Sequence, residues 1–141
     1  IRFAADSARL ATAFAKRGLV PEYGLAWLLP RLIAPSKAFD LLYSCRLVDA
    51  PEALEMGLVD RVYPDGELMP AVLEYARELA TAVSPRSNRV VKQLVYQGLD
   101  QGIDQAMEHC LAEMAEAQKS DDFREGIAAW RDKRAPAFTG R

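Results

Sequence analysis

The sequence contains a single histidine and only two cysteines among its 141 residues. A zinc site of the usual kind and a Ser-His-Asp triad both need histidine, so neither is expected within this chain. Cys45 and Cys110 lack the short spacing of metal-binding cysteines. We therefore predict no metal site, and expect both cysteines to be reduced core thiols of a cytoplasmic protein.

An excess of charge of either sign is also absent, as are long hydrophobic runs. The 18 basic and 20 acidic residues leave a net charge of −2, which gives no reason to expect nucleic acid or an anionic membrane as a partner. The longest apolar run, residues 25–30, is far too short to span a bilayer. A chain that is 50% hydrophobic and 27% charged is typical of one globular domain.

Apolar spacing and breaker residues predict a small amount of strand followed by an array of helices. Before residue 64, the pattern predicts strands at 1–4 and 58–63, an ambiguous segment at 8–14, and helices at 25–29, 35–45 and 50–56. Pro30 should end or bend the first of these helices. After residue 64, it predicts helices at 68–83, 85–98, 103–115 and from 120 onward, each with an apolar face. Asp49 with Glu52, and Asp122 with Glu125, have the spacing of a helix-capping box.

Glu22 is the acidic residue that stands out in the first part of the chain. It lies between Pro21 and Gly24, in a tight connection that leads into the apolar run from Leu25. In or just before the first helical turn, its ionised form would be favoured by the helix dipole and opposed by apolar neighbours. The spacing alone is compatible with an acid/base group and with a simple helix cap.

Five segments together resemble the enoyl-CoA hydratase/isomerase (crotonase) family. They are residues 14–21 (FAKRGLVP), 29–32 (LPRL), 53–64 (ALEMGLVDRVYP), 122–127 (DFREGI) and 133–141 (KRAPAFTGR). The segments occur in the family's order and extend over nearly the whole chain. Members of that family are roughly twice as long, so the chain resembles their second half, and its start without methionine suggests a fragment.

The resemblance implies the fold class and the partners. Residues 1–64 would form the C-terminal part of the crotonase-like ββα spiral, an α/β fold, and residues 65–141 a mainly helical region for trimerisation and for capping coenzyme A (CoA), so the chain would be mostly α. The other half would supply the two peptide N–H groups that stabilise the thioester oxyanion. The implied substrate is an acyl-CoA of the kind used in fatty acid metabolism, without a separate cofactor. The implied assembly is a homotrimer or hexamer, and the fragment alone would be inactive.

The resemblance also exposes a departure from the hydratases. Their second catalytic glutamate falls on Phe14, whose phenyl ring cannot hold or protonate a water molecule. In the dienoyl-CoA isomerases and chlorobenzoyl-CoA dehalogenases of the same superfamily, an aspartate stands where this chain has Glu22. Glu22 thereby becomes the leading candidate for the acid/base or nucleophilic carboxylate, and Phe14 for a substrate contact.

Two further pairs of residues are candidate substrate contacts. The resemblance matches Trp130 and Lys133 with an aromatic residue and a lysine that contact CoA bound by an adjacent subunit. Alternatively, Trp130 belongs to the core and Lys133 to the solvated surface. Tyr23 and Trp27 would either line the acyl pocket or serve only in helix packing.

Three functions remain open from the sequence. The first is an acyl-CoA enzyme in which Glu22 acts as acid or base, by isomerisation, by hydration with a second acid, or by hydrolysis through an acyl intermediate. The second is a non-catalytic crotonase-like scaffold, because one hydratase glutamate is replaced and the fold supports many uses. The third, which the residues would allow without the resemblance, is a helical interaction domain.

Overall fold

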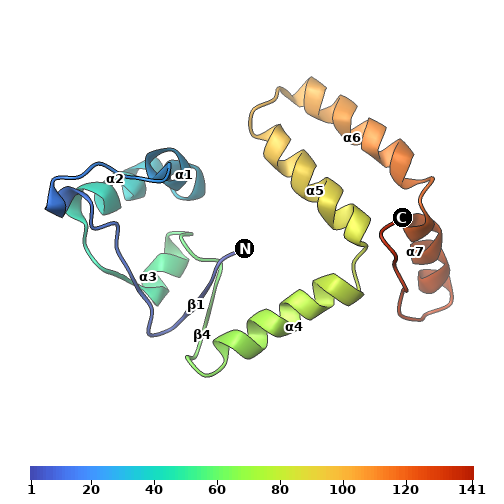
Figure 1. Cartoon of the computed structure of the whole chain (residues 1–141), viewed down its shortest axis with the longest axis horizontal. Coiled ribbons are helices and arrows are strands. Elements are labelled where there is room, and N and C mark those ends of the chain that lie inside the picture. The colour runs from blue at the N-terminus through green and yellow to red at the C-terminus, as the bar shows by residue number, and fades with distance from the viewer. The chain divides into compact units, whose positions relative to one another are not determined.

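The computed structural model describes all residues, 1–141, in two compact units. The first unit is Ile1–Leu73 and the second is Glu74–Arg141. The boundary between the two units lies within helix α4, Leu68–Thr81. Figure 1 shows the order of the elements along the chain.

The first unit combines short strands with short helices. Two strands and a 3-10 helix, η1, come first, then two α-helices, and then a strand, a helix and a strand before α4 begins. The bounds are β1 Phe3–Ala5, β2 Arg9–Leu10, η1 Ala15–Arg17, α1 Leu25–Leu32, α2 Pro35–Ser44, β3 Val48–Asp49, α3 Ala50–Glu55 and β4 Arg61–Tyr63. Pro30 was expected to end or bend this helix. Helix α1 continues through Pro30 to Leu32, so Pro30 does not end it.

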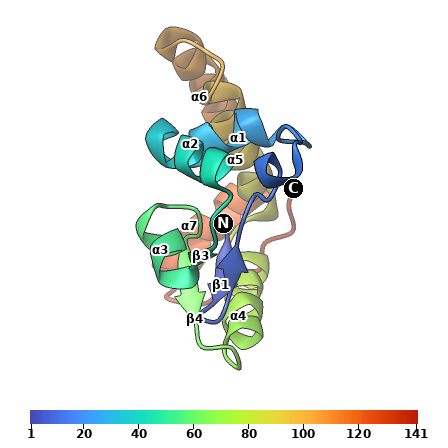
Figure 2. The same ribbon diagram turned by 90° about the vertical axis from the view of Figure 1, so that its left-hand side faces the viewer.

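Two pairs of strands hold the first unit together. β1 pairs in parallel with β4, Phe3 opposite Arg61, and the helices lie in the connection between them, as parallel pairing requires. Figure 2 shows β1 beside β4. β2 pairs with β3 in antiparallel orientation. Arg2 braces the first pair, because its Nε donates to the carbonyl oxygen of Leu58 at 2.7 Å and its backbone N–H to Asp60 Oδ2 at 2.6 Å. The predicted strand at 58–63 is shorter than expected, since its pairing with β1 begins only at Arg61.

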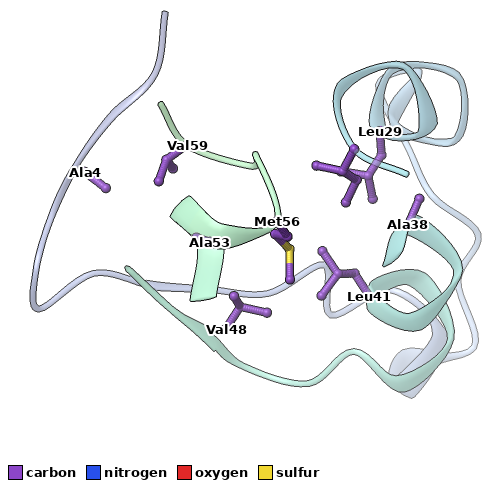
Figure 3. Close-up of a cluster of buried hydrophobic side chains, with 9 residues drawn as sticks. Ala4, Leu29, Ala38, Leu41, Val48, Ala53, Met56 and Val59 are labelled. Carbon is purple, nitrogen blue, oxygen red and sulfur yellow. The ribbon is translucent and has the colours of Figure 1, made fainter. Parts of the chain in front are cut away.

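A hydrophobic core lies between these elements. Side chains from β1, α1, α2, β3 and α3 meet in it, as Figure 3 shows for Leu29, Leu41, Val48 and Met56. The complete cluster consists of Ala4, Leu29, Ile33, Ala38, Leu41, Val48, Ala53, Met56 and Val59. It fixes α1 and α2 relative to the short strands, and thus fixes the loop that enters α1.

Helix ends in the first unit follow local sequence rules. Asp49 is the N-cap of α3, and its side chain accepts a hydrogen bond from the amide of Glu52 at 3.0 Å. Gly57 follows the helix with φ +79°, which a residue without a Cβ adopts easily. The predicted N-cap by Asp49 and the end of this helix before Gly57 are confirmed, but the capping box is only half formed, because the Glu52 carboxylate binds Arg46 and not the amide of Asp49.

The second unit is helical. It holds the end of α4, then α5 Pro85–Gly98, α6 Ile103–Ala117 and α7 Asp121–Arg131. α5 and α6 pack against each other as an antiparallel pair, with Arg86 at the start of α5 lying 3.7 Å from Glu113 near the end of α6. Ser84 caps α5, because its Oγ accepts from the amide of Ser87. The predicted bounds of α5 are confirmed.

The apolar faces predicted for the helices of the second unit are largely exposed in this chain. Met107 and Leu111 of α6 and Val95 of α5 are each more than half exposed. Cys110 is exposed too, so the prediction that it is a core thiol is wrong, whereas Cys45 is buried. Helical spacing identified faces that can pack, but spacing does not say whether the covering surface belongs to the same chain.

The chain is mostly helical with few strands, and in this respect the predicted fold class is confirmed. No helix of the chain combines the length and the apolar character needed to cross a membrane.

Candidate functional site

Glu22 lies in a tight turn that precedes α1. The amide of Leu25 donates to the carbonyl oxygen of Glu22 at 3.0 Å, and the two residues between them, Tyr23 and Gly24, have φ of +53° and +74°. Positive φ at both central positions is the pattern of a type I′ turn. The N-cap of α1 is Gly24, and the first turn of the helix contains no acidic residue. The helix-cap interpretation of Glu22 is therefore wrong.

The Glu22 carboxylate is free within the chain. The residue is exposed, and its side chain makes no hydrogen bond or ion pair. A carboxylate without a partner on a rigid turn is available to a bound molecule. Such a group can accept or return a proton if the substrate presents one within hydrogen-bond distance.

Backbone strain is concentrated near the predicted site residues. Only four residues other than glycine have positive φ: Ala13, Tyr23, Cys45 and Lys133. Ala13 precedes Phe14, Tyr23 follows Glu22, and Lys133 is itself a predicted contact. Side chains with a Cβ avoid this region. At Cys45 it ends α2, and at Tyr23 it forms the turn before α1.

A cavity of about 270 Å³ lies inside the first unit beside this segment. Phe14 and Leu25 contribute to its wall, which is otherwise almost entirely aliphatic. Its lining residues are Leu10, Ala11, Thr12, Phe14, Leu25, Leu29, Leu41, Val48 and Leu58. Of the predicted substrate contacts in this unit, only Phe14 lines the cavity.

Tyr23 and Trp27 face other surroundings. The Tyr23 residue is 92% exposed. Trp27 is half exposed, and its ring lies under the guanidinium of Arg31, whose Cζ is 3.7 Å from the ring centroid. Arg31 also donates to the carbonyl oxygen of Trp27 at 3.0 Å. Neither residue is used in the packing of the core, and their contact with an acyl group remains a prediction.

Thr12 and Cys45 form a polar pair at the cavity wall that the sequence did not reveal. The Thr12 hydroxyl lies 2.8 Å from the carbonyl oxygen of Leu41 and 3.6 Å from Cys45 Sγ. The hydrogen bond from Thr12, followed by those from the backbone at Lys16 and Ala15, lowers the pKa of the Cys45 thiol, although burial opposes this. Thr12 fell in the segment of ambiguous secondary structure, and a threonine among small residues carries no motif that would have marked it.

Arg46 organises a second polar cluster between α2 and α3. Its guanidinium donates to both oxygens of Glu52, at 2.9 and 2.5 Å, and to Asp40 at 2.8 Å. These hydrogen bonds raise the pKa of Arg46 and lower that of Glu52. The three charges satisfy one another, so this cluster joins elements of the fold and offers no free group for chemistry.

In the second unit, Trp130 lies in the last turn of α7 and Lys133 lies two residues beyond the end of that helix. Both are exposed, Trp130 to 82%, and the Lys133 ammonium makes no ion pair. The interpretation of Trp130 as a core residue is therefore wrong for this chain.

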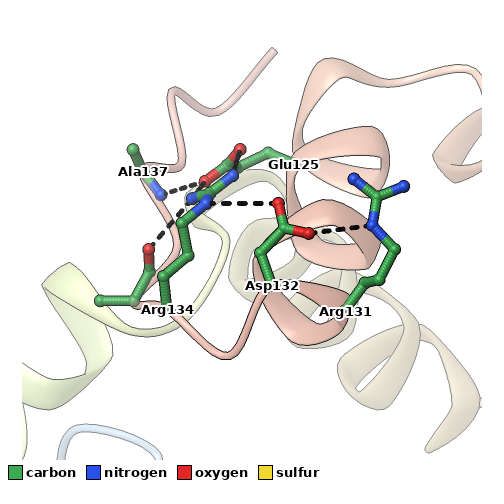
Figure 4. Close-up of polar contacts among 6 residues, drawn as sticks. Glu125, Arg131, Asp132, Arg134 and Ala137 are labelled. Atoms are coloured by element: carbon green, nitrogen blue, oxygen red, sulfur yellow. Dashed lines mark hydrogen bonds and ion pairs between the residues drawn. The ribbon is translucent and has the colours of Figure 1, made fainter.

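Asp122 and Glu125 do not form the predicted capping box. Ser120 is the N-cap of α7, since its Oγ accepts from the amide of Phe123 at 3.1 Å. The two carboxylates bind the C-terminal segment instead: Asp122 accepts from the amide of Thr139, and Glu125 accepts from the amide of Ala137 (Figure 4). The spacing D-x-x-E is compatible both with capping a helix and with binding a distant segment. Only the path of the C-terminal segment shows that the second use applies here.

Comparison with known proteins identifies the family. The sequence profile of the enoyl-CoA hydratase/isomerase family matches residues 1–141. The chain belongs to this family. It is 33% identical over 141 residues to the 1,2-epoxyphenylacetyl-CoA isomerase of Escherichia coli K12, covering 100% of this chain and 53% of that protein. It is 35% identical to the "Probable enoyl-CoA hydratase echA8" of Mycobacterium leprae, covering 98% of this chain and 53% of that protein.

A solved structure from the enoyl-CoA hydratase/isomerase family has the same fold. The enoyl-CoA hydratase of Bacillus anthracis superposes with a TM-score of 0.94 at 30% identity, covering 100% of this chain and 54% of that chain. The chain thus spans about half the length of the relatives that it matches. Relatives with names of both hydratases and isomerases are similar to it, so family membership supports acyl-CoA processing without selecting one reaction.

Proposed function

We propose that this chain is the second half of an acyl-CoA thioester-processing enzyme, in which an enolate-like oxyanion is stabilised by a hole formed in the first half. In this proposal, the complete enzyme is this chain joined to the half that its relatives also contain. Family membership and the coverage of about half of each relative support the proposal. The chain alone is expected to be inactive, because the oxyanion donors would be missing.

Glu22 is the proposed acid/base group. The observation that carries this assignment is the free, exposed carboxylate on a turn whose two central residues both have positive φ. Once the thioester carbonyl is polarised, one carboxylate near the α or β carbon can move a proton between them. A rigid turn holds such a group in place without using its oxygens.

The proposed reaction is one that a single carboxylate can perform, such as isomerisation. Phe14, at the position of the second hydratase glutamate, lines an apolar cavity and can hold no water. Hydration with an acid from the first half, and hydrolysis through an acyl intermediate, are the alternatives. The similarity to a relative named as an isomerase agrees with the proposal.

Trp130 and Lys133 are proposed to contact the CoA part of the substrate bound by an adjacent subunit. An exposed indole can pack beside adenine, and an unpaired ammonium can bind a phosphate. The exposed apolar faces of α5 and α6 support burial against the first half or another subunit in a trimer or hexamer. A cytoplasmic location stays part of the proposal.

Glu22→Gln in the complete enzyme tests the role of Glu22, because glutamine has nearly the same shape but cannot take a proton. A screen of acyl-CoA thioesters first identifies the substrate. We expect kcat to fall by about 100-fold or more, with KM little changed. The matched control is Glu67→Gln, an exposed glutamate of the same unit whose side chain is also unpaired. Unchanged turnover in Glu22→Gln would remove Glu22 from the mechanism.

A non-catalytic scaffold is the second candidate function. The observation that favours it is Phe14 in place of a hydratase glutamate. A scaffold would assemble into the same oligomer and would turn over no thioester in the screen. Turnover that depends on Glu22 would exclude it.

A further inference from the structure

Helix α7 is followed by a lysine, Lys133, at a position where helices often have glycine. The amide of Lys133 donates to the carbonyl oxygen of Trp130 at 3.3 Å, and that of Arg134 to Ala129 at 3.0 Å. These two bonds are those of a Schellman motif, in which the residue at the Lys133 position is usually glycine because its φ is positive. Lys133 has φ +52°. A lysine held in this conformation calls for an explanation beyond ending a helix.

The Glu125 carboxylate and the Arg134 guanidinium hold the segment that follows Lys133. Arg134 donates from its two Nη atoms to the two oxygens of Glu125, at 2.5 and 2.9 Å, and Glu125 Oε1 also accepts from the amide of Ala137 at 2.7 Å (Figure 4). The bond from Arg134, followed by that from Ala137, lowers the pKa of Glu125 to about 2. Glu125 therefore ties α7 to the segment that follows Lys133.

A second carboxylate fixes the last residues of the chain. Asp122 is buried and accepts from the Ser84 hydroxyl at 2.6 Å and from the amides of Thr139 and Gly140 at 2.8 and 3.0 Å. Its own amide donates to the carbonyl oxygen of Arg141 at 3.0 Å. The segment after Lys133 is thus attached to α7 near both of its ends.

The same contacts leave the Lys133 ammonium without a partner. Glu125 is occupied by Arg134, and Asp132 is occupied by Arg131 at 2.9 Å, with Arg134 at 4.0 Å. The carboxylates nearest in sequence are therefore already neutralised by arginines. The lysine charge therefore remains available just beyond the helix that carries the exposed ring of Trp130.

We infer that Glu125 and Arg134 are positioning residues for the nucleotide end of the acyl-CoA. They hold Lys133 in its left-handed conformation and neutralise the competing acids, so that the ammonium and the Trp130 ring together meet a phosphate and a base. This inference rests on the proposed function, since it assigns a task to the pair only if CoA binds there. The pair touches no reacting atom, and its effect should pass through Lys133.

The experiment measures kcat and KM of the complete enzyme with an acyl-CoA and with the matching acyl-pantetheine, which lacks the phosphorylated nucleotide. We expect Glu125→Gln to raise KM for the acyl-CoA several-fold with kcat retained, and Lys133→Ala to raise it by about tenfold. Neither should change KM for the acyl-pantetheine. Glu116→Gln, which breaks the exposed ion pair with Lys119 on α6, is the matched control and should change neither value.

A double variant tests whether the pair acts through the lysine. Glu125→Gln with Lys133→Ala should be no worse than Lys133→Ala alone, because the positioned group is already gone. If Glu125→Gln does not fold, judged by circular dichroism, Arg134→Lys replaces it, since lysine keeps the charge and loses the two-pronged geometry.

Three results would overturn this inference and leave the proposed function standing. In the first, the KM increases of Glu125→Gln and Lys133→Ala multiply in the double variant. In the second, KM rises equally for the acyl-pantetheine, and in the third, Lys133→Ala raises KM for the acyl-CoA but Glu125→Gln does not. If the unaltered complete enzyme neither binds nor turns over any acyl-CoA, the proposed function fails and the inference fails with it.

Discussion

Replacing Lys133 with glycine should make the complete enzyme more stable and its affinity for acyl-CoA weaker. Lys133 has φ +52°, a conformation that costs a residue with a Cβ about 1–2 kcal/mol. Glycine removes this cost, but its greater freedom in the unfolded chain returns about 0.5–1 kcal/mol. The net gain in the free energy of unfolding is therefore about 0.5–1 kcal/mol.

Thermal unfolding and steady-state kinetics measure the two effects separately. A gain of this size corresponds to a rise in Tm of about 2 °C for a protein of this class. KM for the acyl-CoA should rise by about tenfold with kcat retained, because the ammonium is lost. Lys133→Ala is the matched variant, since it loses the same charge but keeps the Cβ. It should show the same KM and no gain in Tm.

Gly57→Ala is the control for the strain argument, because it should change the free energy of unfolding in the opposite direction from Lys133→Gly. Gly57 has φ +79°, and a Cβ added there would meet only the carbonyl oxygen of Leu32, at 3.9 Å, which is an ordinary contact. The variant should therefore lose about 1 kcal/mol from conformational strain alone. If Lys133→Gly were no more stable than Lys133→Ala while Gly57→Ala behaved as expected, the strain argument for Lys133 would be refuted. An unchanged KM in Lys133→Gly would refute its contact with CoA.

Two further predictions concern single carboxylates. Asp49→Ala should lower the free energy of unfolding by about 1 kcal/mol, because the amide of Glu52 loses its acceptor, and Asp49→Asn should recover most of it in denaturant titrations. The pKa of Glu125 is about 2, below its ordinary value of 4.5, so its contribution to stability is complete above pH 4.5 and is lost as the pH falls toward 2. Between pH 6 and pH 3, Tm of the unaltered protein should therefore fall more steeply than Tm of Glu125→Gln, and parallel curves would contradict the assignment.

Predictions that depend on local bonding agreed with the structure. The cap by Asp49, the stop at Gly57 and the bounds of α5 are each decided by residues within a few positions of one another. The backbone amides at a helix end need an acceptor nearby, and the sequence shows which side chain can supply it. The family resemblance was likewise readable from short segments in order, and the family match confirms it.

Predictions that depend on distant segments were less successful. Asp122 and Glu125 have the spacing of a cap, but the returning C-terminal segment offers amides and an arginine that bind them instead. The choice between these two uses of the carboxylates depends on where the rest of the chain passes. Glu22 shows a different limit, because a type I′ turn closed by the amide of Leu25 separates it from the start of α1. That turn is local, but the spacing of Glu22 did not distinguish it from a helix cap.

The sequence by itself determined the family, the helical character of the chain and the helix ends governed by neighbouring residues, because backbone hydrogen bonds and turn preferences act over short distances. Only the tertiary structure decided which charges are free. Arg46 and Glu125 are occupied by partners in space, whereas Glu22 and Lys133 are left unpaired. A charge's availability depends on which opposite charges the fold brings within a few ångströms, and spacing along the chain does not contain that distance.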